Sequence, residues 1–339
     1  MAKSCTDAQA LERQAEAGWL LPYLILLDSY DTNQLTPEER EPIRCEIPPG
    51  GYIGPRRWEY WFTVISQNSL PQERIPQLRF QTSPHPWAEK RVASCLEYAV
   101  DYHYQWYDET WRQLIYWLLY GFGESQLIDG VQRIPDDVKA HWYREFNLAW
   151  LLWQPCDWSA FVLQGGLRKD KRKASPWSKS TGFYATPMDV CSMMASMTFA
   201  GEQDPLIDTR LLSVCDPCVG TGSMLLLASN YSLRLFGQDI VHDLVLACKL
   251  NGYLFAPWMV YMPEATRKML DDKYRAMMGL RRLRGIMSGD AGFDVENEHS
   301  APAGVVVSDN STTTALADQR REQYHEALRV GELEQMSMF

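Results

Sequence analysis

The sequence lacks any apolar run that approaches the roughly 20 residues a membrane-spanning helix needs. No apolar stretch follows the first residues, so a secretory signal peptide is not predicted either. Positive charge is the minority sign, with 33 Lys and Arg against 43 Asp and Glu and a net charge of −10. We therefore expect a cytoplasmic protein without membrane contacts, whose surface as a whole does not attract nucleic acid.

Cysteine is scarce as well. Eight cysteines in 339 residues, without a secretory signal, fit free thiols better than a disulfide framework. Cys215 and Cys218 form a C-x-x-C pair, which invites a redox or zinc interpretation. No second pair has zinc-ligand spacing, and the proline and glycines around this pair already explain a tight turn. No metal site is therefore expected.

Two basic clusters interrupt this acidic sequence. The first consists of Arg168, Lys169, Lys171, Arg172, Lys173 and Lys179. The second consists of Arg267, Lys268, Lys273, Arg275, Arg281, Arg282 and Arg284. Either cluster could line a local groove for DNA, which a net negative charge does not exclude. A flexible linker and solvated helix faces explain the clusters at least as well.

Apolar residues make up 46% of the chain, and in residues 1–165 they follow a helical period. One stripe contains Trp106, Tyr107, Trp111, Leu114, Ile115, Trp117 and Leu118. A second contains Trp142, Phe146, Ala149, Trp150 and Trp153. Spacings of three and four predict helices, so residues 1–165 are interpreted as a mainly helical, Trp-rich domain. Such stripes could stack nucleic-acid bases, but packing between helices is the preferred interpretation.

A change of composition marks the next part of the chain. Residues 166–180 are rich in Lys, Arg, Ser and Gly, which predicts a basic linker. In residues 181–339, predicted strands at 211–215 and 233–236 alternate with predicted helices at 223–230 and 243–254. This alternation is typical of parallel strands joined by crossover helices, so the second domain is expected to have an α/β fold.

A glycine-containing turn follows the first predicted strand, in the segment 216–222. Gly220 and Gly222 lack the Cβ atoms that would block a ligand from the backbone. A P-loop would need Lys-Ser or Lys-Thr after the turn, and a dinucleotide site would need a third glycine where Leu225 stands. Asp216 would repel a pyrophosphate but suits a cationic ligand. S-adenosylmethionine (SAM) is such a ligand, since it carries an ammonium and a sulfonium.

The second predicted strand supplies a matching feature. Asp239 lies just past the end of this strand, 19 residues after Gly220. A carboxylate in this position can accept hydrogen bonds from both hydroxyls of a ribose. Ile240 could then pack on the adenine face. The two features together, in this order and spacing, predict a ligand that contains a nucleoside.

The order of three segments resembles a known family. The segments 181–187 (T-G-F-Y-A-T-P), 216–222 (D-P-C-V-G-T-G) and 237–240 (G-Q-D-I) resemble the F-Y-T-P, D-P-A-C-G-T-G and G-Q-E-I segments of N6-adenine DNA methyltransferases. The resemblance is to the modification subunit of type I restriction-modification systems in particular, and it covers about residues 180–255. Ala185 is inserted in the F-Y-T-P string, and the cysteine of the turn stands one place early.

The resemblance implies a Rossmann-like SAM-dependent methyltransferase core with a parallel sheet, preceded by a helical domain. It assigns residues to the methionine end of SAM, namely Phe183, Thr186 and Pro187. It assigns the turn to the cofactor backbone through Asp216, Pro217, Gly220 and Gly222. Asp239 would bind the ribose, with Ile240 beside the adenine. Asp290 resembles the acid after the third strand, which contacts the SAM adenine.

The catalytic motif departs from the family pattern. An N-P-P-F or D-P-P-Y tetrapeptide is expected after the fourth strand, where its polar groups hold the adenine amino group and its ring stacks on the flipped base. The only Pro-Pro pair here, Pro48-Pro49, is followed by glycine. If residues 304–308 form the fourth strand, Asp309 and Asn310 follow it without proline or an aromatic residue. The catalytic residues therefore stay unassigned, with a degenerate motif at these two positions.

The resemblance implies a SAM-dependent DNA adenine-N6 methyltransferase of the restriction-modification type, or a subunit of one, with DNA as its partner. The degenerate motif leaves an alternative, a catalytically silent SAM-binding protein that associates with DNA. Only about 30 residues follow Val307, so the core is expected to be truncated, with the fourth strand at an open edge beside the first. A protein partner could complete this sheet or supply target recognition.

Overall fold

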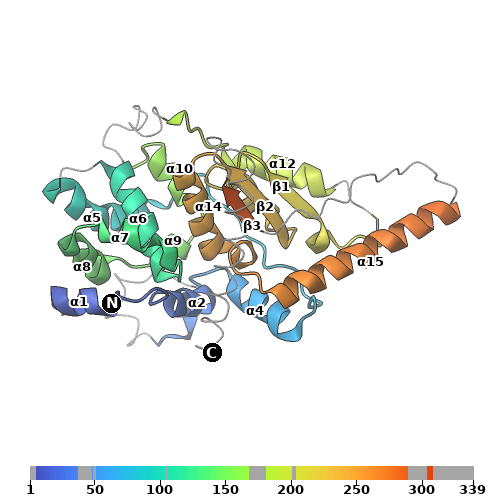
Figure 1. Cartoon of the computed structure of the whole chain (residues 1–339), viewed down its shortest axis with the longest axis horizontal. Helices are drawn as coiled ribbons and strands as arrows, with labels where there is room; N and C mark the ends of the chain where they lie inside the picture. Colours follow the sequence, from blue (N-terminus) through green and yellow to red (C-terminus); the bar gives the residue numbers. More distant parts are fainter. Residues whose placement is uncertain are drawn as a thin grey trace, which may run out of the picture.

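The computed structural model describes residues 5–36, 48, 51–103, 106–167, 181–200, 204–288 and 304–307. Figure 1 shows a helical region on one side and a small sheet on the other, with α14 (His242–Phe255) between them. A long helix, α15 (Glu264–Ser288), extends away from the body. No helix in the described ranges is long and apolar enough to cross a membrane.

The described residues before 165 form helices, as the periodicity predicts. The α-helices are α1 (Asp7–Arg13), α2 (Leu21–Ser29), α4 (Arg57–Gln67), α5 (Pro86–Tyr102), α6 (Tyr107–Gly121), α7 (Ile128–Gln132), α8 (Asp136–Glu145), α9 (Ala149–Leu152) and α10 (Trp158–Leu163). Their ends follow local chemistry: Thr6 caps α1 in a capping box with Gln9, and α5 begins with Pro86 in its first turn.

The tryptophan stripes pack inside the helical region. Trp111, Trp117 and Trp142 are almost fully buried, and Trp150 is 5% exposed. The rings of Trp117 and Trp142 lie 5.8 Å apart, edge to face. Buried rings cannot receive a nucleic-acid base, so core packing is the correct interpretation for these residues. Trp106, at the start of α6, is 57% exposed and does not share this role.

Strands and helices alternate in the second half of the chain, with boundaries close to those predicted. The elements are α12 (Met188–Ala200), β1 (Ser213–Asp216), α13 (Ser223–Ala228), β2 (Arg234–Asp239), α14, α15 and β3 (Gly304–Val307). The three strands are parallel and lie in the order β1-β2-β3. Cys215 pairs with Phe236, and Gly237 pairs with Val305.

The strand at 304–307 is not where the sequence analysis placed it. It was expected to lie beside the first strand as a fourth strand, but β3 pairs with β2 on the side opposite to β1. The reason lies in residues 264–288, which form the single helix α15 and leave no strand before residue 289. β3 is therefore the third strand of the described sheet, and β1 is the edge where a fourth would pair.

A buried arginine joins the helical region to the sheet region. Arg57, at the start of α4, is fully buried and donates hydrogen bonds to Ser229 Oγ (2.6 Å) and to the Phe255 carbonyl (2.8 Å). It also bonds the Pro76 carbonyl at 2.9 Å and Asn230 Oδ1. The hydrophobic core also joins the two regions, because one cluster of buried apolar side chains contains residues of α6 and of α14. The two-domain division at residues 166–180 stays a prediction, and residues 168–180 lie outside the described ranges.

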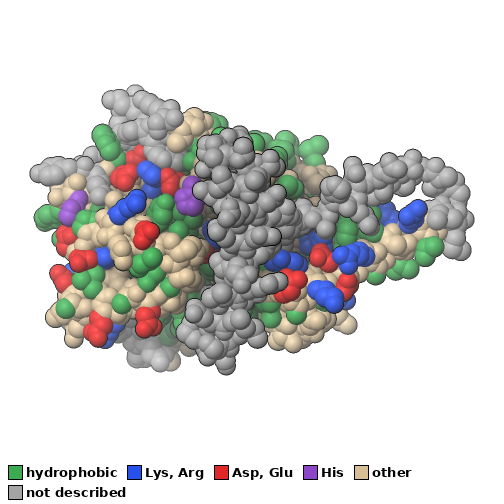
Figure 2. Space-filling model, in the orientation of Figure 1, with side chains coloured by type: hydrophobic (Ala, Val, Ile, Leu, Met, Phe, Trp, Pro, Cys, Tyr) green, Lys and Arg blue, Asp and Glu red, His purple; other side chains and the backbone are tan. Residues whose placement is uncertain are grey.

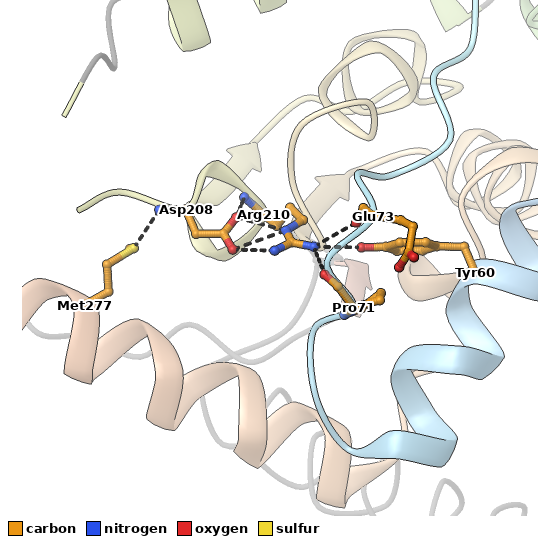
Figure 3. Close-up of polar contacts among 6 residues, drawn as sticks. All are labelled: Tyr60, Pro71, Glu73, Asp208, Arg210 and Met277. Carbon is orange, nitrogen blue, oxygen red and sulfur yellow. Dashed lines mark hydrogen bonds and ion pairs between the residues drawn. The ribbon is translucent and has the colours of Figure 1, made fainter. Parts of the chain in front are cut away.

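A second arginine, Arg210, fixes the residues that precede β1 through several polar contacts (Figure 3). Arg210 forms an ion pair with Asp208 at 2.7 Å and donates to the carbonyls of Pro71 (2.7 Å) and Glu73 (3.0 Å). Asp208 N in turn contacts Met277 Sδ of α15 at 3.2 Å. The loop after α4, the residues before β1 and α15 are thus joined at the amino end of the sheet, away from the turn that follows β1.

Candidate functional site

The turn after β1 has a conformation that requires glycine. Gly220 and Gly222 have φ angles of +55° and +93°, in the left-handed region. A Cβ atom on Gly222 would lie 2.7 Å from Cys248 Sγ in α14. Asp216 Oδ1 closes the turn by accepting a hydrogen bond from Cys218 N at 3.0 Å. Both predicted glycines therefore allow a left-handed backbone, and Gly222 also allows the turn to pack closely against α14.

The structure brings the turn and Asp239 together. Gly220 N donates to Asp239 Oδ2 at 2.9 Å, and Val241 N donates to Asp239 Oδ1 at 2.9 Å. Val219 N donates to the carbonyl of Gln238 at 2.9 Å, so the turn lies against the end of β2. Each carboxylate oxygen keeps a lone pair for a further donor. Ile240 follows and is 69% exposed, so its side chain is open to a ligand.

Gly237 has a role that the sequence analysis missed. A Cβ atom on Gly237 would lie 2.7 Å from Val219 Cγ2 and 3.0 Å from Leu225 Cδ1. The glycine therefore lets the turn and α13 pack directly against β2. A glycine inside a strand signals such a close approach, and this signal was available in the sequence.

The segment 183–187 lies against the same turn. The ring of Phe183 is the nearest neighbour of Gly220, with Cε2 3.4 Å from where a Cβ atom would lie. Tyr184 is 81% exposed. A cavity of about 280 Å³ opens here. On one side it is lined by Tyr184, Ala185, Thr186, Pro187, Met188 and Ser223. On the other side it is lined by Thr82, Asp157, Ala160, Phe161, Gln164, Gly165 and Gly166 of the helical region.

Asp157 is a site residue that sequence reasoning did not find. It caps α10 by accepting from Ala160 N at 2.9 Å, and it is 5% exposed. Its Oδ2 accepts from Thr221 Oγ1 and from Ser223 Oγ, both at 2.6 Å. Its Oδ1 also accepts from Asn251 Nδ2 at 3.0 Å. Its local pattern marks only a helix cap, because the side chains that bond it are more than 60 residues away in the sequence.

Negative charge gathers around the turn. Three carboxylates surround it, those of Asp157, Asp216 and Asp239. Burial raises the pKa of the Cys248 thiol well above its usual range, and these three carboxylates raise it further. Burial, followed by Asp157 and Asp216, likewise raises the pKa of Cys191 to about 11. Such a site favours a cationic ligand over a phosphate, in agreement with the argument from Asp216.

Three predicted positions lie outside the described residues, namely Asp290, Asp309 and Asn310. The prediction that Asp290 follows a strand is wrong, because the residues before it form the end of α15. Asp309 and Asn310 follow β3, which pairs with β2 and is not a fourth strand beside β1. The catalytic residues therefore stay unassigned, and the roles of the other site residues stay predictions.

The second basic cluster lies on α15 and away from the turn. Arg284 forms an ion pair with Asp204 at 2.7 Å, and this acid precedes β1 at the amino end of the sheet. Arg275 pairs with Asp272 at 3.1 Å, so the helix carries both signs of charge. Figure 2 shows basic side chains along α15 with acidic ones among them. A solvated helix face explains this cluster better than a groove at the edge of the sheet that carries the glycine turn.

These elements bring the glycine turn, Asp239 and Phe183 together at the carboxyl end of a parallel sheet. Residues 171–256 match the model of a family described as N-6 DNA Methylase. This segment contains the three predicted motifs, so the predicted resemblance to the N6-adenine DNA methyltransferase family is confirmed over these residues. The family implies methyl transfer with DNA as the substrate. No curated protein and no solved structure matches the chain significantly.

Proposed function

We propose that the chain is a SAM-dependent DNA adenine-N6 methyltransferase of the restriction-modification type, or a subunit of one. The observation that carries the proposal is the direct hydrogen bond from Gly220 N to Asp239, with Phe183 packed on the same glycine. Three segments that are separate in the sequence meet at one point, and these are the segments to which the family resemblance assigns cofactor contacts. The match over residues 171–256 supports the same function.

The chain's own residues fit the cofactor in three places. Asp239 would accept the ribose hydroxyls with its remaining lone pairs, and Ile240 would cover one face of the adenine. The backbone of Gly220 and Gly222 would lie along the cofactor without a Cβ in the way. Thr186 and Pro187 line the cavity, which would hold the methionine end. When bound, SAM supplies the methyl group.

Binding of SAM is expected to weaken by about ten- to a hundredfold in Asp239→Ala. The variant loses a charge-assisted pair of hydrogen bonds, worth about 1.5–3 kcal/mol. It also removes the acceptor for Gly220 N, so the turn loses one of its hydrogen bonds to the end of β2. Isothermal titration of SAM into both proteins measures the effect. Asp272→Ala, an exposed acid on α15, is the matched control and should bind like the wild type. No heat with the wild type, or equal affinity of Asp239→Ala, would contradict cofactor binding at this site.

A second candidate function is a catalytically silent SAM-binding protein that associates with DNA. The observation that favours it is the free edge of β1, where no strand pairs within the described residues. Ser213 and Cys215 of β1 are exposed, whereas the central strand of a complete parallel sheet would be covered. The exposed apolar side chains of the neighbouring α12 are Val190, Met193, Met194 and Met197. Both features suit a protein partner that completes the sheet beside β1 or supplies target recognition.

The chain alone is therefore expected to transfer methyl groups to DNA at or near background. A flipped adenine would lack a stacking ring worth about 1–3 kcal/mol, by analogy with single-strand binders. Labelled SAM, mixed-sequence DNA and nucleoside analysis measure the product, on a sample shown to be monomeric by light scattering. Asp239→Ala is the control for any residual signal. Robust formation of N6-methyladenine by the monomer would show that catalysis is complete without a partner.

A further inference from the structure

The methionine-end cavity has one wall from the helical region, and that wall contains a buried carboxylate. Asp157 lines the cavity together with Ser223, the first residue of α13. Asp157 is 5% exposed and Ser223 is 6% exposed. All of the hydrogen bonds described for Asp157 come from neutral donors. No ion pair reaches it within the part of the chain that the structure describes. The Asp157 carboxylate therefore lies beside the cavity without an ion-pair partner among the described residues.

The direction of these hydrogen bonds matters for a ligand. A carboxylate only accepts, so the hydroxyls of Thr221 and Ser223 must donate to Asp157 Oδ2. With its proton committed, Ser223 Oγ can only present lone pairs to the cavity. Asn251 Nδ2 is fixed in the same way, because it donates to both Asp157 Oδ1 and the Thr221 carbonyl. At Ser223 the cavity wall therefore presents a hydrogen-bond acceptor, with the Asp157 carboxylate next to it.

We propose that Asp157 is a positioning residue that makes the methionine end of the site selective for the α-ammonium group of the cofactor. It acts through Ser223, whose oxygen accepts a hydrogen bond from the ammonium group, and through the attraction of its own carboxylate for a cation. This inference rests on the proposed function, since it concerns the same cofactor site. It assigns the helical region a part in cofactor recognition, in addition to its packing against α14.

The substitution Asp157→Asn is expected to reverse the direction of the hydrogen bond between residue 157 and Ser223. An amide keeps the size of the side chain and can still cap α10. Its NH₂ group donates, so a hydroxyl that faces it must accept and turn its own proton toward the cavity. Ser223 would then meet the ammonium with a donor. Loss of the negative charge also weakens the attraction of the site for the ammonium group.

Two adenosine compounds separate this role from general support of the turn. S-adenosylhomocysteine and 5′-methylthioadenosine both have a neutral sulfur, but only the first has the amino-acid end. Calorimetry on Asp157→Asn is expected to show at least a tenfold loss of affinity for S-adenosylhomocysteine and less than about a twofold change for 5′-methylthioadenosine. Ser223→Ala should show the same selectivity with a smaller loss, about three- to tenfold, as for a neutral hydrogen bond. Asp129→Asn, an exposed acid on α7, is the charge-matched control.

The outcomes are distinct. Equal losses for both compounds in Asp157→Asn and in Ser223→Ala would mean that the residues only support the turn, and would overturn the inference. Unchanged affinity in both variants would overturn it as well. If Asp157→Asn does not fold, Ser223→Ala decides alone. If the wild type binds neither SAM nor the two compounds, the proposed function itself fails, and the inference fails with it.

Discussion

Replacing Arg57 by methionine is expected to lower the free energy of unfolding by about 3–5 kcal/mol, because the change removes one partner from a buried polar network. The side chain is fully buried, and its four acceptors come from the loop after α4 and from the ends of α13 and α14. Methionine fills much of the volume but donates no hydrogen bond. Urea unfolding followed by tryptophan fluorescence measures the loss.

The loss should depend on pH through Asp28, which lies near Arg57. Burial raises the pKa of Asp28 to about 6, against the opposing effects of backbone hydrogen bonds and of Arg57. A raised folded-state pKa means that stability falls as pH rises from the unfolded value toward the folded one. In the wild type this fall ends near pH 6. Without Arg57 the pKa of Asp28 rises further, so stability keeps falling above pH 6, and the penalty is expected to be larger at about pH 8 than at about pH 5.

The neighbouring arginine provides the control. Arg56 pairs with Glu59 at 2.8 Å, with both side chains about half exposed. Arg56→Met should therefore change stability by no more than about 1 kcal/mol. Equal effects of the two substitutions, or a penalty for Arg57→Met that does not change with pH, would contradict the structural role of the buried arginine and its coupling to Asp28.

The substitution Gly222→Ala is expected to weaken SAM binding by at least about 30-fold. A left-handed backbone costs a residue with a Cβ about 1–2 kcal/mol, which alone corresponds to roughly five- to thirtyfold. The new Cβ would also lie 2.7 Å from the Sγ atom of Cys248, which is fully buried. The turn must therefore shift away from the conformation in which it meets Asp239. Calorimetry with SAM, together with an unfolding curve, separates lost binding from lost folding.

Two further variants sharpen this test. Gly279→Ala on α15 adds a Cβ that meets nothing within 4 Å, and SAM affinity should be unchanged. Adding Cys248→Ala to Gly222→Ala removes the steric contact but leaves the backbone strain, so affinity should recover only in part. Wild-type affinity of Gly222→Ala would mean that the turn does not carry the cofactor.

The amino-acid sequence by itself determined the local features of this protein. The spacing of Trp111, Trp117 and Trp142 predicted helices whose tryptophans pack inside, because a helix repeats its faces every three to four residues. The order of the glycine turn and Asp239 predicted a single site, because parallel strands bring their carboxyl ends to the same edge. The family relationship followed from the same short segments.

Only the tertiary structure decided which distant residues meet. Strand order depends on pairing across the whole sheet, so the strand at 304–307 could be recognised as a strand but not placed, and it pairs with β2. Asp157 meets Ser223 across 66 residues, and Arg57 meets Ser229 across 172. A lone aspartate or arginine has no periodic pattern. Its burial and its partners exist only after the helical region has packed against the sheet, and that packing brought Asp157 to the cavity beside the glycine turn.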